Sequence, residues 1–345
     1  MIPVKSNAPW HRLLHTHVGR TYPPAFYEPI KNHQVRESLQ RIANETEEDY
    51  QVLIQVLTGM GVTVSRPTIN VNSTIMDYID SSGRIDYMCS QSYTLIPRPP
   101  MQPRDSFLVV DDVVLETNSE AKIMLDSLDI EKRVDPWINY QRYRLLPEQT
   151  FDAPLATVVG DRIIVDCREH GWLASYFKKA FPDHQIRAVY IGGHNDAVYA
   201  VIKPGVLIST YHHDNYRETF PGWQVKHIEN QSWNAIPNWR KIKHSNINRY
   251  WLPEEIDNRE FSHFLDTWLS QWLGYVQETV FDINVLQIDQ STVLVNNYNK
   301  EMFAFLAQHG VEAVVVPFRH RFFWDGGLHC ITNDIYRQGD KENYF

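Results

Sequence analysis

The sequence predicts an α/β protein built from a repeated module: a β-hairpin, a helix and a further strand. Helical-period segments follow three of four similar hairpins. The first three hairpins begin roughly 40 to 50 residues apart, a spacing typical of one supersecondary unit per repeat. Each hairpin has an apolar strand, a tight polar turn and a second strand ending in a small or polar residue. The four hairpins are Phe107–Thr117, Ala156–Cys167, Val198–Thr210 and Val285–Asn296.

The first two helices are expected from the residues at their ends. A helix over Thr46–Met60, with Thr46 as its N-cap, ends at Gly61 ahead of an apolar strand at Val62–Ser65. After the first hairpin, Ser119 is expected to cap a helix over Ser119–Leu128, because apolar positions recur behind it.

The other two helices follow the second and fourth hairpins. The segment Glu169–Phe181 is amphipathic and stops before Pro182, which cannot continue a helix. The segment Lys300–His309 stops at Gly310 and leads into a strand expected at Val311–Val316.

An insertion separates the third hairpin from the fourth. Residues Trp223–Gln277 are rich in Trp, Asn and Ile, and the Trp side chains are too many for a solvent loop. They are therefore expected to pack the insertion onto the body of the protein. No low-complexity linker separates the units, so residues 1–345 are predicted to form one domain with an insertion at about 223–277.

Composition limits the classes of partner. The net charge of −9 comes with no basic stripe, which argues against a nucleic-acid partner. No run approaches the ~18 apolar residues that a membrane span needs. The first residues lack the apolar core of a signal peptide. Three scattered cysteines are too few for a disulfide framework, so a cytoplasmic setting is expected.

Cys330 is the candidate nucleophile. It follows Gly326-Gly327 closely and precedes a β-prone run. Glycines allow backbone angles closed to other residues and let another group approach closely, so a sharp bend is expected here. A thiol in such a place is a candidate nucleophile if a histidine and carboxylates elsewhere can serve it.

His194 and Asp196 lie where the third hairpin begins. Residues two apart in a strand point to the same face, so both side chains are expected to project together. A lone His-x-Asp is more often a satisfied histidine near a turn, and a single acidic residue before a strand is more often a cap. Asp105 and Asp152, however, stand just upstream of their own hairpins. If the units assemble around an axis, these positions converge with Cys330 at one end of the ring.

Other clusters favour structural roles. His11, His15 and His17 resemble a run of metal ligands, but no Cys or carboxylate is spaced to complete a site. They are expected to flank the first strand, and residues His212–Asp214 are expected in a solvated loop. Cys89 and Cys167 are expected to be small apolar core residues.

Several short motifs follow one another along nearly the whole chain. They are Val18-Gly19-Arg20, Pro103-Arg104-Asp105, Phe151-Asp152-Ala153, His194-Asn195-Asp196 and Gly326-Gly327-Leu328-His329-Cys330-Ile331-Thr332. Each alone is weak, but their order together with the last motif is specific. In this order the chain resembles the amidinotransferases of the pentein (guanidine-modifying) superfamily, those of the arginine:glycine type in particular.

The resemblance implies a five-bladed, pseudo-symmetric α/β propeller, the pentein fold. It implies that Cys330 is the nucleophile, His194 the general acid/base and Asp152 the carboxylate that orients this histidine. Asp105 and Asp196 correspond to the pair that grips the guanidinium, a planar fork of donors that carboxylates bind bidentately. No metal or organic cofactor is implied. The implied partners are a small-molecule guanidino donor and an amine acceptor, and a homodimer is one assembly that the family allows.

The function expected from this resemblance is amidino transfer from L-arginine, or a related guanidino donor, to a primary amine such as glycine. A guanidine hydrolase of the same superfamily, a deiminase or dihydrolase, is the alternative, with water in place of the amine. A non-catalytic propeller that only binds ligands is disfavoured, because nucleophile, base and all three carboxylates are present together.

The positions that specify the substrate depart from the family. Arginine-using members have an arginine shortly after the Pro-Gly hairpin, whereas this chain has Ser209–Asp214, with Arg217 only later. Gln277-Glu278 stand where the family offers serines, and Pro154-Leu155 replace its usual Asn or Asp. The sequence therefore predicts preserved core chemistry and an altered substrate shell.

Overall fold

The structure is a computed structural model that describes most of the chain. The described residues are 1–79, 96–137, 141–146, 148–210, 215–229, 258–269, 272 and 282–345. The sequence predictions for Cys89, His212–Asp214 and Gln277-Glu278 lie outside these residues. Within the described part of the chain, no helix is both long and apolar enough to cross a membrane.

In the described part of the chain, five three-stranded sheets form the body of the protein, and all have the same pairing pattern. In each, two strands pair antiparallel and a third joins in parallel. Four sheets are continuous in sequence, and their hairpins are β3–β4, β6–β7, β9–β10 and β12–β13, which confirms the four predicted hairpins.

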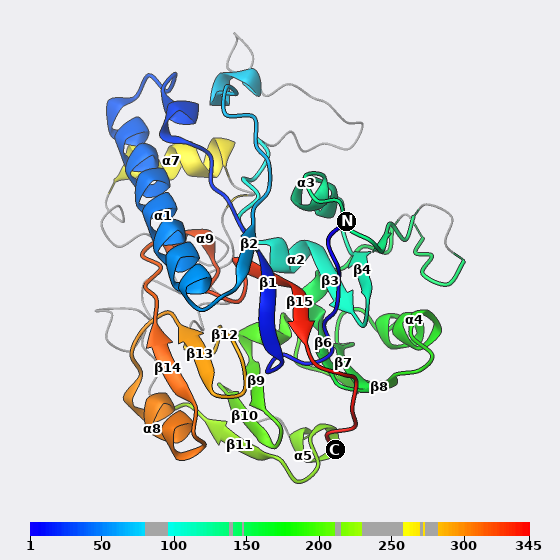
Figure 1. Ribbon diagram of the computed structural model, residues 1–345. Helices are drawn as coiled ribbons and strands as arrows, with labels where there is room; N and C mark the ends of the chain where they lie inside the picture. The colour runs from blue at the N-terminus through cyan, green and yellow to red at the C-terminus, as the bar shows by residue number, and fades with distance from the viewer. Residues whose placement is uncertain are drawn as a thin grey trace.

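The bounds of these four sheets follow chain order (Figure 1). The first comprises β3 (Phe107–Val110), β4 (Val113–Glu116) and β5 (Arg133–Val134), and the second β6 (Ala156–Val159), β7 (Arg162–Asp166) and β8 (Gln185–Val189). The third comprises β9 (Tyr199–Lys203), β10 (Val206–Ser209) and β11 (Gln224–His227), and the fourth β12 (Leu286–Gln287), β13 (Thr292–Val295) and β14 (Glu312–Val315).

The fifth sheet joins the two ends of the chain. Strand β15 (Thr332–Gln338) pairs antiparallel with β1 (Arg12–Val18), and β2 (Thr63–Ser65) pairs parallel with β1. In Figure 1 the blue β1 and the red β15 run side by side near the middle of the molecule. The module is therefore split here, with its first strand supplied by the C-terminal segment.

The long first helix begins earlier than predicted. Helix α1 spans His33–Gly59, and its N-cap is Asn32, whose side chain accepts a hydrogen bond from the Val35 backbone N–H. The prediction of Thr46 as the N-cap is wrong. Its hydroxyl lies inside the helix, donates to the Ile42 carbonyl and accepts from the Trp324 indole. The predicted stop at Gly61 agrees with the structure, since this residue has a φ of 81°.

The other predicted helices are present with shorter bounds. They are α3 (Ala121–Leu125), α4 (Leu173–Ala180) and α8 (Lys300–Gln308). The N-cap position of α3 is Glu120, so the prediction of Ser119 is wrong, and the Asn118 side chain accepts from the Glu120 backbone N–H instead. The described residues also form α2 (Pro103–Ser106), α5 (Tyr216–Thr219), α7 (Arg259–Trp268) and α9 (Arg321–Trp324). The 3-10 turns are η1 (Pro24–Tyr27), η2 (Ile75–Asp77), η3 (Ala153–Leu155) and η4 (Asn195–Ala197).

The region predicted as an insertion contributes to two parts of the fold. Strand β11 falls within it and completes the third sheet beside β10. Helix α7 packs against α1, as Figure 1 shows. Trp272 is fully buried and its indole donates to the Ile96 carbonyl at 2.7 Å, which confirms the expected packing for this residue. Residues Trp233, Trp239 and Trp251 lie outside the described residues.

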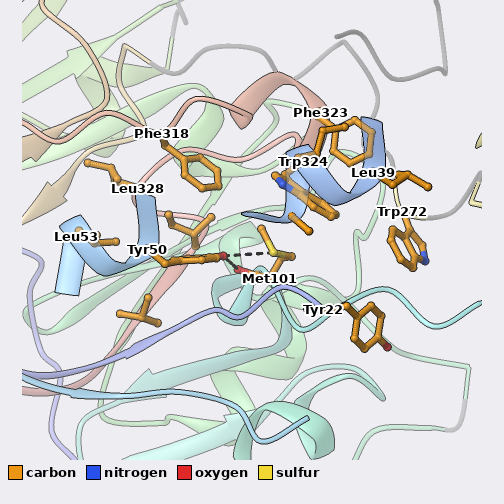
Figure 2. Close-up of a cluster of buried hydrophobic side chains, with 14 of the residues drawn as sticks. Tyr22, Leu39, Tyr50, Leu53, Met101, Trp272, Phe318, Phe323, Trp324 and Leu328 are labelled. Carbon is orange, nitrogen blue, oxygen red and sulfur yellow. Dashed lines mark hydrogen bonds between the residues drawn. The ribbon is translucent and has the colours of Figure 1, made fainter. Parts of the chain in front are cut away.

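A hydrophobic cluster supports the segment that leads to Cys330. Figure 2 shows Trp324 and Leu328, which flank Gly326-Gly327, packed among side chains of α1 and Phe318. The Tyr50 hydroxyl of α1 donates to the Met101 carbonyl at 3.0 Å. Arg319 also donates to Asp49 of α1 at 2.8 Å. Helix α1 therefore holds the segment on both sides of its glycine turn.

Candidate active site

The segments that precede the first strand of each of the five sheets lie next to one another. The lead-in segments, defined as residues 102–106, 151–155, 194–198, 282–285 and 326–331, directly precede β3, β6, β9, β12 and β15. Contacts between their side chains connect all five: His194 reaches Asp152 and Asp105, while Asn284 reaches Asp196 and Cys330. The convergence predicted for Cys330, His194, Asp105, Asp152 and Asp196 is therefore observed.

Cys330 is buried at a tight turn. A Cβ atom at Gly326 would come within 2.4 Å of the Gln102 amide nitrogen, and one at Gly327 within 2.6 Å of Asn284 Oδ1. Neither glycine has a positive φ, and the left-handed residue of this turn is Asp325, with a φ of 50°. The glycines are thus required for the close approach of other side chains. The unusual backbone angles predicted for the glycines are found at Asp325 instead.

His194 stands between two carboxylates. Its Nε2 lies 3.4 Å from Asp152 Oδ2, and its Nδ1 lies 3.9 Å from Asp105 Oδ1. His194 is the N-cap residue of η4 and does not lie in a strand, so the predicted strand geometry for His194 and Asp196 is wrong. The 3-10 turn nevertheless brings both residues into the same cluster.

Asp152 is held in its ionised form. Burial raises the pKa of this carboxyl, but the hydrogen bond and charge of His194 outweigh it and leave the pKa below its ordinary value. The Asn118 side-chain amide also donates to Asp152 Oδ1 at 3.2 Å. An anionic Asp152 can therefore accept a hydrogen bond from the imidazole and fix its orientation.

Asp105, in contrast to Asp152, favours its protonated form. Burial raises the pKa of this carboxyl to about 8, and the positive charge of His194 only partly opposes this rise. Among the described residues, the buried Oδ1 atom of Asp105 has no hydrogen-bond partner. The side chain is therefore a desolvated acceptor that lacks a donor.

The two carboxylate oxygens of Asp196 differ, because Oδ2 accepts hydrogen bonds and Oδ1, among the described residues, does not. Its Oδ2 accepts from His329 Nδ1 at 2.7 Å and from the Asn284 amide at 3.2 Å, and it lies 3.5 Å from Cys330 Sγ. Although burial alone would raise the pKa of Asp196, the hydrogen bond from His329 outweighs it and lowers the pKa to about 2. Within the described chain, its buried Oδ1 has no partner.

The chain was compared with protein-family models, curated proteins and solved structures. No family model matches. The inosamine-phosphate amidinotransferase 1 of Streptomyces glaucescens is 23% identical over 342 residues, which cover 88% of this chain and 84% of that protein. The mitochondrial glycine amidinotransferase of Danio rerio is 25% identical over 153 residues, 44% of this chain and 28% of that protein.

The fold agrees with that of a solved amidinotransferase. The structure described as SxtG, an amidinotransferase from Microseira wollei in the saxitoxin biosynthetic pathway, superposes with a TM-score of 0.65. The identity is 17%, and the superposition covers 99% of each chain. The chain is a pentein-fold relative of the amidinotransferases. The family resemblance and the α/β fold class predicted from the sequence are thus confirmed.

Two site residues of this pentein protein were missed in the sequence. Asn284 contacts both Cys330 and Asp196, and His329 donates to Asp196. A signal for Asn284 was present, because it precedes β12 by two residues, as Asp105 precedes β3 and Cys330 precedes β15. The repeat therefore points to Asn284, whereas the family resemblance points to Gln277-Glu278 before the same hairpin.

Arg98 is a third site residue, and it belongs to none of the sequence motifs described above. Its guanidinium donates to Gln102 Oε1 and to the Trp324 carbonyl, the latter at 3.2 Å. Its positive charge lowers the pKa of both Asp105 and Asp152, although burial remains the largest influence on each. Its buried Nε has no hydrogen-bond partner within the described residues. Arg98 thus supplies a positive charge that acts on both carboxylates.

The described residues contain no group of three His, Cys, Asp or Glu side chains placed to hold a metal ion. The three N-terminal histidines separate: His15 and His17 each lie 2.9 Å from Ser65 Oγ, and His11 contacts the Tyr344 hydroxyl. His15 and His17 are in β1 itself, so they lie within the first strand and do not flank it. Cys167 is buried in a hydrophobic cluster, as predicted.

Proposed function

We propose that this protein transfers an amidino group from L-arginine, or a related guanidino donor, to a primary amine through a covalent intermediate on Cys330. The observation that carries the proposal is the pair of buried carboxylate oxygens, Asp105 Oδ1 and Asp196 Oδ1, that lack donors among the described residues. A guanidinium offers five N–H donors in a planar fork and a positive charge, and so matches both needs at once.

The first half of the reaction follows from the residues around the bound donor. Cys330 gives its proton to His194, because only the thiolate is an effective nucleophile. Its sulfur forms a bond to the central guanidinium carbon, and the bond from that carbon to the donor's substituted nitrogen breaks. The departing amine takes a proton from His194, whose ring Asp152 orients. The amidino group is then attached to Cys330.

The second half reverses these bonds with a new amine. The acceptor gives a proton to His194, and its nitrogen attacks the amidino carbon. The carbon–sulfur bond breaks and restores the Cys330 thiolate. Asp105 and Asp196 remain paired with the guanidinium group that forms. The same histidine therefore acts as acid in one half and as base in the other.

Arg98 supports a donor or acceptor that also carries an anionic group. Its positive charge lowers the pKa of both Asp105 and Asp152, and its buried Nε has no hydrogen-bond partner within the described residues. The carboxylate of arginine or glycine would supply the complementary charge. The names of the relatives include an inosamine phosphate and glycine, so a phosphate on the acceptor is the second anion to test. Glycine is the example of a primary amine that the family resemblance implies.

The decisive experiment is incubation with labelled arginine and a panel of amines that includes glycine and an aminated cyclitol phosphate, with readout by mass spectrometry. Amidino transfer predicts ornithine and a guanidino product in equal amounts, both dependent on added amine. It also predicts an amidino group on the Cys330 peptide. Cys330→Ala should abolish turnover, and Cys167→Ala should retain it. Citrulline formed without any acceptor would instead establish a hydrolase.

The role of Arg98 has a separate test. Arginine and agmatine differ only in the carboxylate, so Arg98→Gln should raise KM for arginine while leaving KM for agmatine near its original value. A hydrogen bond to a charged group contributes about 1.5–3 kcal/mol, so the expected rise in KM is roughly 10–100-fold. Equal effects on both donors would show that Arg98 does not bind the carboxylate.

A further inference from the structure

The Asn284 side chain lies between the sulfur of Cys330 and the carboxylate of Asp196. Its amide nitrogen is 3.0 Å from Cys330 Sγ, 3.2 Å from Asp196 Oδ2 and 3.4 Å from the Asp196 carbonyl oxygen. Asn284 is only 3% exposed, so water cannot easily replace these contacts. The two amide hydrogens are therefore committed to the sulfur and to Asp196.

The other half of the same amide holds the nucleophile's backbone. Asn284 Oδ1 accepts from the backbone N–H of His329 at 2.9 Å and of Cys330 at 3.1 Å. Gly327 permits this approach, because a Cβ atom there would lie 2.6 Å from Asn284 Oδ1. One side chain thus fixes the backbone of Cys330 and donates to its sulfur.

The lead-in segment of β12 is itself held in place. The Asn297 and Asn299 amides donate to Asp282 Oδ1 at 2.9 and 3.2 Å, and the Asn296 amide donates to the Asn284 carbonyl at 3.0 Å. Asn296 Oδ1 also accepts from the Leu328 backbone N–H at 3.2 Å. Two asparagines therefore bind the turn before Cys330, and Asn284 also donates to the sulfur.

An amide is chemically suited to this position. The carboxylate of Asp196 lies 3.5 Å from Cys330 Sγ, and a carboxylate disfavours a second negative charge nearby. An amide N–H donates to a thiolate, carries no charge and does not ionise in the working pH range. We propose that Asn284 is a catalytic residue that stabilises the Cys330 thiolate beside Asp196. Its part in amidino transfer rests on the proposed function, but its effect on the sulfur does not.

The test is the pH dependence of Cys330 alkylation by iodoacetamide, followed by mass spectrometry of the Cys330 peptide, because this reaction needs no substrate. Loss of a donor to a charged sulfur should move the half-maximal pH upward by about one to two units in Asn284→Ser. Asn284→Asp adds negative charge beside the sulfur and should move it upward at least as far. Below the midpoint, each unit corresponds to tenfold slower alkylation.

Asn296→Ser is the matched control, because it removes a second contact to the same turn. Its half-maximal pH should stay within a few tenths of a unit of the original protein. The proposal is overturned if both Asn284 variants, shown to be folded by circular dichroism, keep the original profile, or if Asn296→Ser shifts as far as Asn284→Ser. A shifted profile in a protein that transfers no amidino group would support this inference and reject the proposed function. Amidino transfer with an unshifted profile would support the proposed function and reject this inference.

Discussion

Asp105 and Asp196 occupy similar places and have opposite ionisation. Both belong to lead-in segments that precede the first strand of a sheet, and both have a buried oxygen without a partner among the described residues. Burial acts to raise the pKa of each carboxyl. The pKa of Asp105 is about 8, whereas that of Asp196 is about 2. The hydrogen bond and charge of His329 lower the pKa of Asp196. Burial and the charges of Asp152 and Asp196 raise the pKa of Asp105, and among the described residues its buried Oδ1 has no hydrogen-bond partner.

One carboxylate is therefore charged before a ligand arrives, and the other becomes charged with it. Asp196 attracts a guanidinium as a preformed anion. Asp105 must lose a proton as the cation binds, because a buried carboxylate is stable as an anion only beside a positive charge. The two halves of the proposed guanidinium site therefore contribute differently to affinity at neutral pH.

Removal of His194 should have the largest effect on this pair. His194→Ala takes away the proposed acid and base, which contributes roughly 10²–10⁴-fold to the rate. It should also raise the pKa of Asp105 further, since the charge of His194 lowers it. Steady-state rates across pH measure the first effect. A variant that retains near-normal rates would show that another group transfers the proton.

Asp196→Asn should weaken donor binding more than any change at Asp105. The substitution removes the preformed anion and also the acceptor for His329. An uncompensated charged hydrogen bond costs about 1.5–3 kcal/mol, so binding should weaken about 10–100-fold. Calorimetry on a Cys330→Ala background isolates binding from chemistry. Unchanged affinity for arginine would remove Asp196 from the donor site.

Asp105 should make donor binding depend on pH. A guanidinium stays protonated in the working range, so it requires Asp105 in its anionic form. Affinity on the Cys330→Ala background should therefore rise as pH increases from 6 to 8, by at most about tenfold per unit, with release of a proton that depends on the buffer. Additional Asp105→Asn should abolish both the slope and the proton release. If donor affinity still depends on pH in the Asp105→Asn variant, a different group causes the pH dependence.

The smallest effect concerns stability, where the two carboxylates should act with opposite sign. The folded pKa of Asp105 is raised above its unfolded value, so its contribution is lost as pH rises from about 4 to 8. The folded pKa of Asp196 is lowered, so its contribution is present above about pH 4 and lost as pH falls through 2. Asp105→Asn should thus raise the Tm at pH 8 relative to pH 5 by a few degrees, at about 2 °C per kcal/mol. A flat difference between the two pH values would contradict the raised pKa of Asp105.

The sequence was most informative where a single local pattern determined the structure. The hairpins at Phe107–Thr117 and Ala156–Cys167 follow from short apolar runs with turn residues between them, and both are present as predicted. Cys330, His194 and the three carboxylates came from the repeat and the family resemblance, and the structure brings them together. The roles of these residues remain predictions, as does the single-domain organisation of the chain.

The missed features depend on contacts between distant segments. Thr46 has a capping residue type, but its hydroxyl is used by Trp324, far along the chain. Asn284 gains its importance only when the turn at Gly327 lies against it. The pKa difference between Asp105 and Asp196 likewise arises from burial and from His329, which a linear pattern does not display. Such properties exist only in the folded protein.

The pairing of β1 with β15 has a consequence for how the site is built during folding. Their register joins Val18 to Thr332, so this sheet contains some of the most distant pairings in the chain. Contacts of high sequence separation form slowly, because the intervening loop must first be closed. Cys330 stands two residues before β15 and follows the other four lead-in segments in the chain. The docking of β15 onto β1 is therefore the step that brings the sulfur to the four earlier lead-in segments.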